Sequence, residues 1–335
     1  MSNYQDRLSM LVEIEKQRES KVISYITGDR RHLETQISSE VIDLFVQHLD
    51  AIGPVGRLSL ILHTNGGDTS AAWRLVNLLH TFCDELEVII PSKALSAGTL
   101  ISLGADKIVM SKQAALGPID PSLNHPLNPV IPFSPNVTFP VSVEAVRGYL
   151  DAAKDMGIQD PHVLGEILKD LSNKVHPLVL GQIFRSRSQI RFLAHKLLQR
   201  QVKDEGKIKE IADFLCAESG SHDYTINRRE ARSLGLQVEH PSSEFYGIIR
   251  GFIQSYVEEM QLLNPFDPYS MMGVSLTIPY TVSRGAIESV ATGSHQFFSE
   301  GILTKSLTQQ MGPQGPFQQE SINDNRRFEG WRKVS

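Results

Sequence analysis

Hydrophobic and polar positions alternate in two different rhythms between residues 21 and 110. Short runs rich in β-branched and aliphatic side chains, typical of strands, occupy residues 22–27, 58–62, 86–90 and 107–110. Between these runs, apolar side chains recur about every 3.6 positions, the spacing of an amphipathic helix, over residues 39–52, 70–82 and 96–103. This alternation predicts the α/β fold class, with right-handed βαβ units that build a parallel sheet.

A proline-rich stretch interrupts the pattern from residue 118 to residue 140. Seven prolines within it remove backbone donors and block regular helix, which predicts an extended loop over the sheet edge. Helical periodicity returns over 142–155 and from 177 to about 204. The second helix carries a basic stripe, which we interpret as a solvated face rather than a contact for a subunit or a polyanion. Further helices are predicted at 227–235 and 244–263.

The C-terminal part of the chain predicts an extension and a tail. Two strand-like runs, 274–282 and 286–292, flank Ser283-Arg284-Gly285, which predicts a β-hairpin with a three-residue turn. From residue 307 the chain is rich in Gln, Gly, Pro and Asn, a composition typical of disorder. The predicted divisions are an N-terminal helical segment, an α/β domain, a helix-and-hairpin extension and a disordered tail, over residues 1–20, 21–240, 241–306 and 307–335.

Composition narrows the class of protein. The chain has 335 residues, 41% of them hydrophobic, and a formal net charge of -5, so its apolar fraction can fill a core and disorder throughout is excluded. Its 33 basic and 38 acidic side chains lack the basic excess of proteins that bind nucleic acid or membrane surfaces. Two cysteines are too few for a disulfide framework or a zinc site. No apolar run approaches the roughly 20 residues of a membrane helix, and residues 1–18 do not resemble a secretory signal. We therefore expect a cytoplasmic protein without an integral membrane anchor.

The first segment with candidate chemistry is His63-Thr-Asn-Gly-Gly-Asp68, which directly follows the run 58–62. Paired glycines at the carboxyl end of a parallel strand let backbone N–H groups point into a crevice, and ligands of such sheets bind at that edge. The segment lacks the lysine and the spacing of a P-loop, which argues against a nucleotide phosphate. Fixed N–H donors of this kind suit an oxyanion hole. His63 and Asp68 are expected to orient the turn.

The second segment is Lys93-Ala-Leu-Ser-Ala-Gly-Thr99, which follows the strand run 86–90. A turn of small residues that begins a helix places the Ser96 hydroxyl at the positive end of that helix. Ser96 could then attack a carbonyl, with the Ala97 N–H as one oxyanion donor and the N–H of Gly66 or Gly67 as the other. Taken alone, Ser96 would be an ordinary N-cap. The two segments on consecutive βα turns favour the catalytic interpretation.

The order of these motifs carries a resemblance to a known family. A strand with Thr27-Gly28 comes first, then Asn65-Gly-Gly67 and Ser96-Ala-Gly98, each after a further helix and strand, and then Gly117-Pro-Ile-Asp-Pro121. This order resembles the ClpP/crotonase-fold serine peptidases. The chain looks most similar to their SppA-like branch, in particular the cytosolic serine dehydrogenase proteinase family, to about residue 300. The resemblance implies a ClpP/crotonase-like domain over residues 21–240, peptide-bond hydrolysis by Ser96, and a homo-oligomer.

The sequence indicates the general base less clearly than the nucleophile and the oxyanion donors. ClpP-like peptidases carry a histidine in the segment that matches residues 117–121, but this chain has Ile119 and Asp120 there, so a ClpP-type triad is not expected. SppA-like enzymes use a lysine, supplied from further along the chain or from a neighbouring subunit. A lysine becomes a base only where burial or nearby positive charge lowers its pKa. Lys174, just ahead of a predicted helix start, is the first candidate, and His222 is the second. Other candidates are interpreted as surface groups: Lys154, Lys169 and His125.

Together with these features, the resemblance implies a serine endopeptidase that forms a Ser96 acyl-enzyme on peptide or unfolded protein substrates and requires no cofactor. The chain carries no ATPase signature, so the predicted activity is ATP-independent by itself. Two alternatives stay open. One is a crotonase-like acyl-CoA enzyme, in which the paired N–H groups hold a thioester enolate. The other is a catalytically silent scaffold with the same fold.

Overall fold

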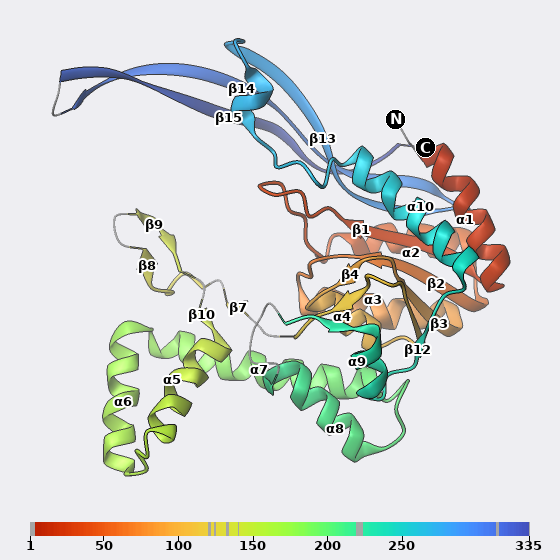
Figure 1. Cartoon of the computed structure of the whole chain (residues 1–335), viewed down its shortest axis with the longest axis horizontal. Coiled ribbons are helices and arrows are strands. Elements are labelled where there is room, and N and C mark those ends of the chain that lie inside the picture. Colours follow the sequence, from red (N-terminus) through yellow and green to blue (C-terminus); the bar gives the residue numbers. More distant parts are fainter. Residues whose placement is uncertain are drawn as a thin grey trace.

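The computed structural model describes residues 4–119, 122–123, 125–131, 134–139, 141–218, 224–312 and 315–334. Its centre is an eight-stranded sheet, whose strands in chain order are β1 (Lys21–Thr27), β2 (Val55–His63), β3 (Cys83–Ile90), β5 (Lys107–Met110), β12 (Val238–Glu239), β13 (Thr277–Ser289), β14 (Gly293–Gly312) and β15 (Gly315–Lys333). Across the sheet the order is β12-β5-β3-β2-β1-β13-β14-β15 (Figure 1). The strands from β12 to β1 run parallel, whereas β13, β14 and β15 add antiparallel neighbours. The predicted parallel sheet is therefore present, and it continues into an antiparallel extension.

Helices cover both faces of this sheet because its central strands are apolar on both sides. Along β2, Leu60 and Leu62 belong to one hydrophobic cluster, and Ile61 between them belongs to the other, as the alternation of side chains along a strand requires. The first cluster packs against α2 (Val41–Ile52), α3 (Thr69–Phe82), α4 (Ala97–Leu103) and the C-terminal half of α7 (Pro177–Leu198). The second packs against α1 (Tyr4–Arg18) and α10 (Ser243–Glu259).

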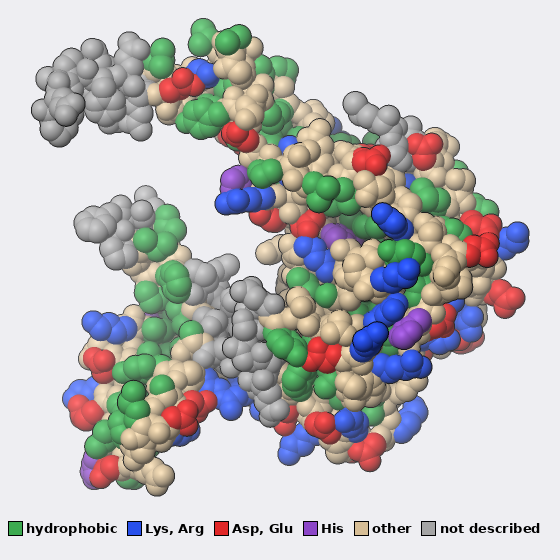
Figure 2. Space-filling model, viewed as in Figure 1, with side chains coloured by type: hydrophobic (Ala, Val, Ile, Leu, Met, Phe, Trp, Pro, Cys, Tyr) green, Lys and Arg blue, Asp and Glu red, His purple; other side chains and the backbone are tan. Residues whose placement is uncertain are grey.

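An arm of helices projects away from the sheet (Figure 1). It consists of α5 (Val143–Asp155), α6 (Pro161–Lys174) and the N-terminal half of α7, around a small separate hydrophobic cluster that includes Val146, Val179 and Ile183. No side chain of α6 is buried, and Figure 2 shows hydrophobic side chains on the surface of the arm. The arm and the β14–β15 hairpin project to the same side of the molecule (Figures 1 and 2).

Shorter elements connect these parts. A three-stranded sheet in the order β11-β6-β4 consists of β4 (Lys93–Ala94), β6 (Ala115–Leu116) and β11 (Ile226–Asn227). The proline-rich stretch contains short paired strands, namely β7 (Ser122–Leu123) with β10 (Val141–Ser142), and β8 (Val130–Ile131) with β9 (Ser134–Thr138). The remaining helices are α8 (Glu205–Asp213), the π-helical turn Phe214–Glu218, α9 (Arg228–Ser233) and α11 (Pro268–Met272). Across the described ranges, no helix combines the length and the apolar character needed to cross a membrane.

The predicted hairpin turn at Ser283-Arg284-Gly285 is wrong. The β13 strand passes through these residues, with a bulge between Ser283 and Gly285. Gly285 pairs with Thr27 of β1 on one side and with Phe297 of β14 on the other, so the strand continues although the local sequence looks like a turn. The chain reverses instead between Ser289 and Gly293, where β13 ends and β14 begins.

The predicted disordered tail from residue 307 is also wrong for the residues that the structure describes. There β14 continues to Gly312, and β15 pairs with it antiparallel, in a register that matches Lys333 with His295. The Trp331 ring packs edge-on against Phe297, 5.5 Å between centroids, and its Nε1 donates to a Glu40 carboxylate oxygen at 3.1 Å. The polar composition predicted disorder because it offers little apolar surface to bury. Pairing with β14 instead gives the backbone N–H and C=O groups of this segment hydrogen-bond partners.

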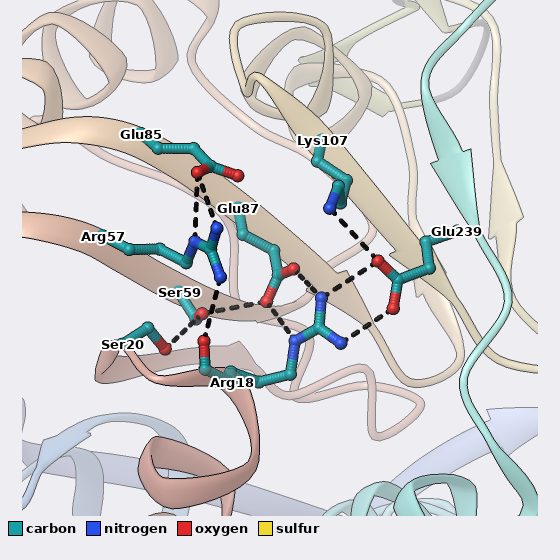
Figure 3. A network of polar contacts seen from close by, with 8 residues as sticks. All are labelled: Arg18, Ser20, Arg57, Ser59, Glu85, Glu87, Lys107 and Glu239. Atoms are coloured by element: carbon teal, nitrogen blue, oxygen red, sulfur yellow. Dashed lines mark hydrogen bonds and ion pairs between the residues drawn. The ribbon is translucent and has the colours of Figure 1, made fainter.

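The amino-terminal end of the parallel sheet is held by a network of ion pairs (Figure 3). Arg18, at the end of α1, contacts the buried Glu87 carboxylate of β3 and, at 2.7 Å, the Glu239 carboxylate of β12. Lys107 of β5 also pairs with Glu239, at 3.3 Å. The pKa of the Glu239 carboxyl is lowered, chiefly because Arg18 donates to it. The network joins α1 and β12 to the inner strands at the opposite end from the candidate site.

Candidate active site

The two glycine-bearing segments lie side by side at the carboxyl end of the parallel strands. The Thr64 N–H donates to the Lys93 carbonyl at 3.1 Å, and the Leu95 N–H donates to the Thr64 carbonyl at 3.1 Å. These two bonds join the residue that follows β2 to the short strand β4. The turn that carries Gly66 and the turn that carries Ser96 are therefore held next to each other by backbone pairing.

Ser96 adopts a backbone conformation that other residues seldom occupy. Its φ is 51° and its ψ is -113° at the N-cap of α4, and its side chain makes no capping hydrogen bond. Such a positive φ in a non-glycine residue costs of the order of 1–3 kcal/mol and often occurs at functional sites. A serine on a sharp turn between strand and helix is also the geometry that exposes the nucleophile in α/β-hydrolases. Ser96 therefore does not act as an ordinary N-cap, because its side chain does not make the capping hydrogen bond.

The diglycine turn packs directly against Ser96. A Cβ atom on Gly66 would lie 2.8 Å from the Ser96 Cβ and 3.2 Å from the Ser96 Oγ. On Gly67 it would lie 2.3 Å from the Ile37 carbonyl oxygen. Both glycines have positive φ, 115° and 145° respectively, so each needs glycine for its conformation as well as for space. The structure thus brings together the two segments that the sequence analysis paired.

Hydrogen bonds distinguish the amides of this turn. The Gly66 N–H donates to the Thr64 Oγ1 at 2.9 Å, and that hydroxyl accepts a further hydrogen bond from the Thr27 Oγ1 at 2.8 Å. In the described parts of the chain, neither the Gly67 N–H nor the Ala97 N–H donates to a protein acceptor. Asp68 is the N-cap of α3, because its carboxylate accepts from the Ser70 N–H and the Ala71 N–H, and it fixes the chain directly after the diglycine turn.

The turn that carries Ser96 is fixed from its other side by Thr99. The Thr99 Oγ1 lies 2.9 Å from the Ala94 carbonyl and 2.8 Å from the Gly117 carbonyl, and it accepts from the Gly117 N–H at 3.1 Å. Ile119, where the resemblance would place a histidine, is fully buried in the main core. Asp120 lies outside the described residues.

Of the two candidate bases, the structure describes only Lys174, and it does not bring Lys174 to Ser96 within one chain. Lys174 is exposed at the C-terminal end of α6, on the arm that projects away from α4 (Figure 1). His222 lies outside the described residues. Lys154 and Lys169 are exposed on α5 and α6, each in an ion pair with a carboxylate on its own helix.

A charged cluster that the sequence analysis missed stands beside the two turns. The Asp29 carboxylate lies 2.5 Å from the Lys93 Nζ and 3.5 Å from the His63 Nε2. Burial alone would raise the pKa of the Asp29 carboxyl, but the contacts with His63 and Lys93 outweigh it and hold that pKa below its usual range. Within the described residues, neither ring nitrogen of His63 has a well-aligned hydrogen-bond partner. The sequence indicated this cluster only in part, since His63 and Lys93 belong to the two motifs. No feature of the neighbouring sequence indicates that Asp29 belongs to it. No group of three or more His, Cys, Asp or Glu in these residues is arranged to hold a metal ion.

Comparisons with known proteins agree with the sequence resemblance. A family model described as "ClpP-like SDH-type serine proteinase" matches residues 1–133. Two uncharacterized proteins of Methanocaldococcus jannaschii are similar over most of the chain. MJ0137 is 30% identical over 243 residues, which cover 70% of this chain and 73% of the relative. MJ1495 is 29% identical over 240 residues, covering 69% and 71%.

Solved structures show weaker similarity. A mutant of the membrane-bound stomatin-specific protease 1510-N aligns with 17% identity over 62% of this chain and 75% of its own, at a TM-score of 0.36. ClpP1 from Listeria monocytogenes aligns with 13% identity over 70% of this chain and 99% of its own, at a TM-score of 0.37. At these TM-scores the similarity says nothing about the site.

Proposed function

Because this chain belongs to the ClpP-like SDH-type serine proteinase family, we propose that it is a serine endopeptidase that cleaves peptide or unfolded protein chains with Ser96 as the nucleophile. The observation that carries the proposal is the placement of Ser96. Its strained turn lies against the diglycine turn, and the amides of Gly67 and Ala97 have no protein acceptor in the described residues. The family accounts for the reaction class, and this geometry supports the assignment of the residues.

In the proposed reaction, the Ser96 Oγ attacks the carbonyl carbon of the scissile peptide bond. The serine proton moves to a general base, a C–O bond forms, and the carbonyl oxygen takes up the negative charge. The base then gives the proton to the leaving amine as the C–N bond breaks, and a water molecule hydrolyses the acyl-enzyme by the same steps.

For the oxyanion we favour the N–H groups of Gly67 and Ala97. The Gly66 N–H is already used by the Thr64 hydroxyl, whereas no acceptor in the described parts of the chain takes a hydrogen bond from the other two amides. Backbone donors that are fixed before the reaction cost no reorganisation when the charge develops, and the loss of one such donor typically slows catalysis by about 10² to 10³. Gly66 in this proposal gives space to Ser96 rather than a hydrogen bond.

For the general base we retain Lys174 and His222, and we propose that Lys174 acts across an interface in a homo-oligomer. A lysine works as a base only where burial or nearby positive charge disfavours its charged form, but Lys174 is exposed in one chain and α6 carries no buried side chain. A second copy that covers the arm would bury this face and could deliver Lys174 to the Ser96 of its neighbour.

The first experiment is labelling with a fluorophosphonate probe, read by mass spectrometry, together with hydrolysis of a fluorescently labelled unfolded protein. We expect Ser96→Ala to lose the label and to reduce hydrolysis by at least about 10³-fold. Ser188→Ala, an exposed serine on α7, is the matched control and should keep both. Labelling or hydrolysis that persists in Ser96→Ala would contradict the assignment of Ser96 as the nucleophile. If the native protein takes no label, the catalytically silent scaffold is favoured instead.

The base is tested by mixing two variants. If Lys174 acts across an interface, Ser96→Ala and Lys174→Ala are each inactive, but a co-refolded mixture contains sites with both residues and regains part of the activity. A mixture that stays inactive would contradict this arrangement. The same mixture with His222→Ala decides whether His222 takes this role instead.

A further inference from the structure

Three segments meet at the carboxyl edge of the parallel sheet, and they carry Asp29, His63 and Lys93. Asp29 follows the end of β1 by two residues, His63 is the last residue of β2, and Lys93 is the first residue of β4. His63 precedes Gly66 by three residues, and Lys93 precedes Ser96 by three. One carboxylate therefore contacts the segment that leads to the oxyanion turn and the segment that leads to the nucleophile.

The cluster depends on the charge of Asp29. The His63 side chain is only 5% exposed, and its ring nitrogens have no well-aligned partner in the described residues. The nearby Asp29 carboxylate, at 3.5 Å from Nε2, is thus the group that compensates for the burial of this ring. The Lys93 Nζ, 2.5 Å from the other oxygen of the same carboxylate, is partly exposed. Without the negative charge, the ammonium group and the buried ring would both lose their partner.

Small displacements of the two turns would disturb the site, because the diglycine turn is packed tightly against Ser96. Gly66 leaves no room for a Cβ beside Ser96, and Ser96 is held at a positive φ. A misplacement of reacting groups by about 1 Å can slow an enzyme by about 10²-fold. A group that fixes the separation of the two turns therefore influences the rate without touching the substrate.

We propose that Asp29 is a positioning residue for the Ser96 site, which acts through Lys93 and His63 to hold the nucleophile turn and the diglycine turn in register. This inference rests on the proposed function of Ser96. Asp29 takes no proton in the reaction and contacts no reacting atom. Its role is to keep the Ser96 Oγ and the oxyanion donors at a fixed separation.

The test compares Asp29→Asn with Glu239→Gln. Glu239 is a matched control, because its carboxylate also bridges two cations, Arg18 and Lys107, but at the opposite end of the sheet (Figure 3). In Asp29→Asn we expect the rate of fluorophosphonate labelling at Ser96 and kcat to fall about 10- to 100-fold, while KM changes less than about threefold. In Glu239→Gln the labelling rate should stay within about twofold of the native rate.

Two further variants show whether the cluster acts as one unit. Asp29→Glu keeps the charge and should recover part of the labelling rate. Lys93→Met should slow labelling as well, and the double variant Asp29→Asn/Lys93→Met should lose little more than the worse single variant, because residues that act through one contact are not additive. Additive losses would overturn the proposal.

The remaining outcomes are also decisive. Labelling of Asp29→Asn within twofold of the native rate overturns the positioning role, and so does a loss that matches only the fraction of unfolded protein measured by circular dichroism. An equal loss in Glu239→Gln overturns it too. If the native protein itself takes no label, the proposed function fails first and the positioning role falls with it.

Discussion

At the scale of single residues, the candidate site depends on small side chains and hydroxyl groups. The meeting of Gly66 and Gly67 with Ser96 was predictable, because their two segments follow neighbouring buried strands and so lie at one edge of the sheet. The contacts of Thr27 and Asp29 were not predictable, because they join residues more than thirty positions apart. No local pattern reports a partner that only the folded sheet brings near.

Gly66→Ala should disable the site without unfolding the protein. The new Cβ would lie 2.8 Å from the Ser96 Cβ and 3.0 Å from the Leu95 carbonyl oxygen, at a φ of 115°. We expect a destabilisation of about 1–3 kcal/mol and a fall in Ser96 labelling of at least about 100-fold. Urea unfolding and the labelling rate measure the two effects.

Gly247→Ala on α10 is the control, because a Cβ there meets nothing within 4 Å and α10 lies outside the arm. It should leave labelling unchanged and stabilise the helix by roughly 0.5–1 kcal/mol. Unimpaired labelling in Gly66→Ala would show that Ser96 does not need the close approach of the diglycine turn.

At the scale of elements, the α/β half was the predictable part. Each inner strand is a short apolar run, and each covering helix repeats at the helical period, so local patterns and tertiary packing agree from β1 to β5. The C-terminal strands were not predictable for the opposite reason. Gly285 looks like a turn residue until β1 and β14 pair on either side of it, and the polar β15 is a strand only because β14 lies beside it. Long-range pairing overrides local sequence there.

The root of this antiparallel extension contains a buried pair of histidines, which predicts a pH-dependent stability. His48 of α2 is fully buried, with its Nδ1 2.7 Å from the Ser289 Oγ and its Nε2 3.0 Å from the His295 Nδ1. Burial, together with the neighbouring His295 and Lys333, lowers the pKa of His48 to about 3. The unfolded chain, with a histidine pKa of about 6.5, therefore binds the proton more readily, so stability is present above that pH and is lost as the pH falls towards 3.

Between pH 7.5 and pH 5, His48 gains a proton in the unfolded chain but stays neutral in the folded protein, which should lower the free energy of unfolding by about 2 kcal/mol. The lowered pKa of His295 acts in the same direction. Urea unfolding at the two pH values should show a smaller difference for His48→Gln than for the native protein. His162→Gln, at an exposed position of α6, should keep the native difference. An unchanged difference in His48→Gln would contradict this account.

At the scale of the whole molecule, the chain has separate hydrophobic cores that share one helix. The N-terminal half of α7 contributes Ile183 to the cluster of the arm, and its C-terminal half contributes Ile190 to the main core beneath the sheet. Sequence periodicity predicted a long helix there but not the division of its apolar face between two cores. The exposed apolar side chains of the arm, such as Met156 and Leu168, support the proposed contact with a second copy.

The same substitution at two places on α7 should therefore have different effects. Ile183→Ala removes a fully buried side chain from the arm and should weaken that core by about 2–5 kcal/mol, which hydrogen exchange would register as faster exchange in α5 and α6 but not in β1, β2 or β3. Ile190→Ala should instead lower the melting temperature of the whole sheet domain. Identical exchange patterns for the two variants would show that the cores are not separate.

The helix that joins these cores, α7, also connects the arm to the short helix α4. α7 has 22 residues, and at about 1.5 Å per residue it is a rod roughly 33 Å long. Near its inner end, the Leu197 side chain lies so close to Gly104, the C-cap of α4, that a Cβ there would be 2.8 Å away. A partner that binds the outer half of α7 would therefore contact a helix whose inner end packs against the short helix that begins right after Ser96.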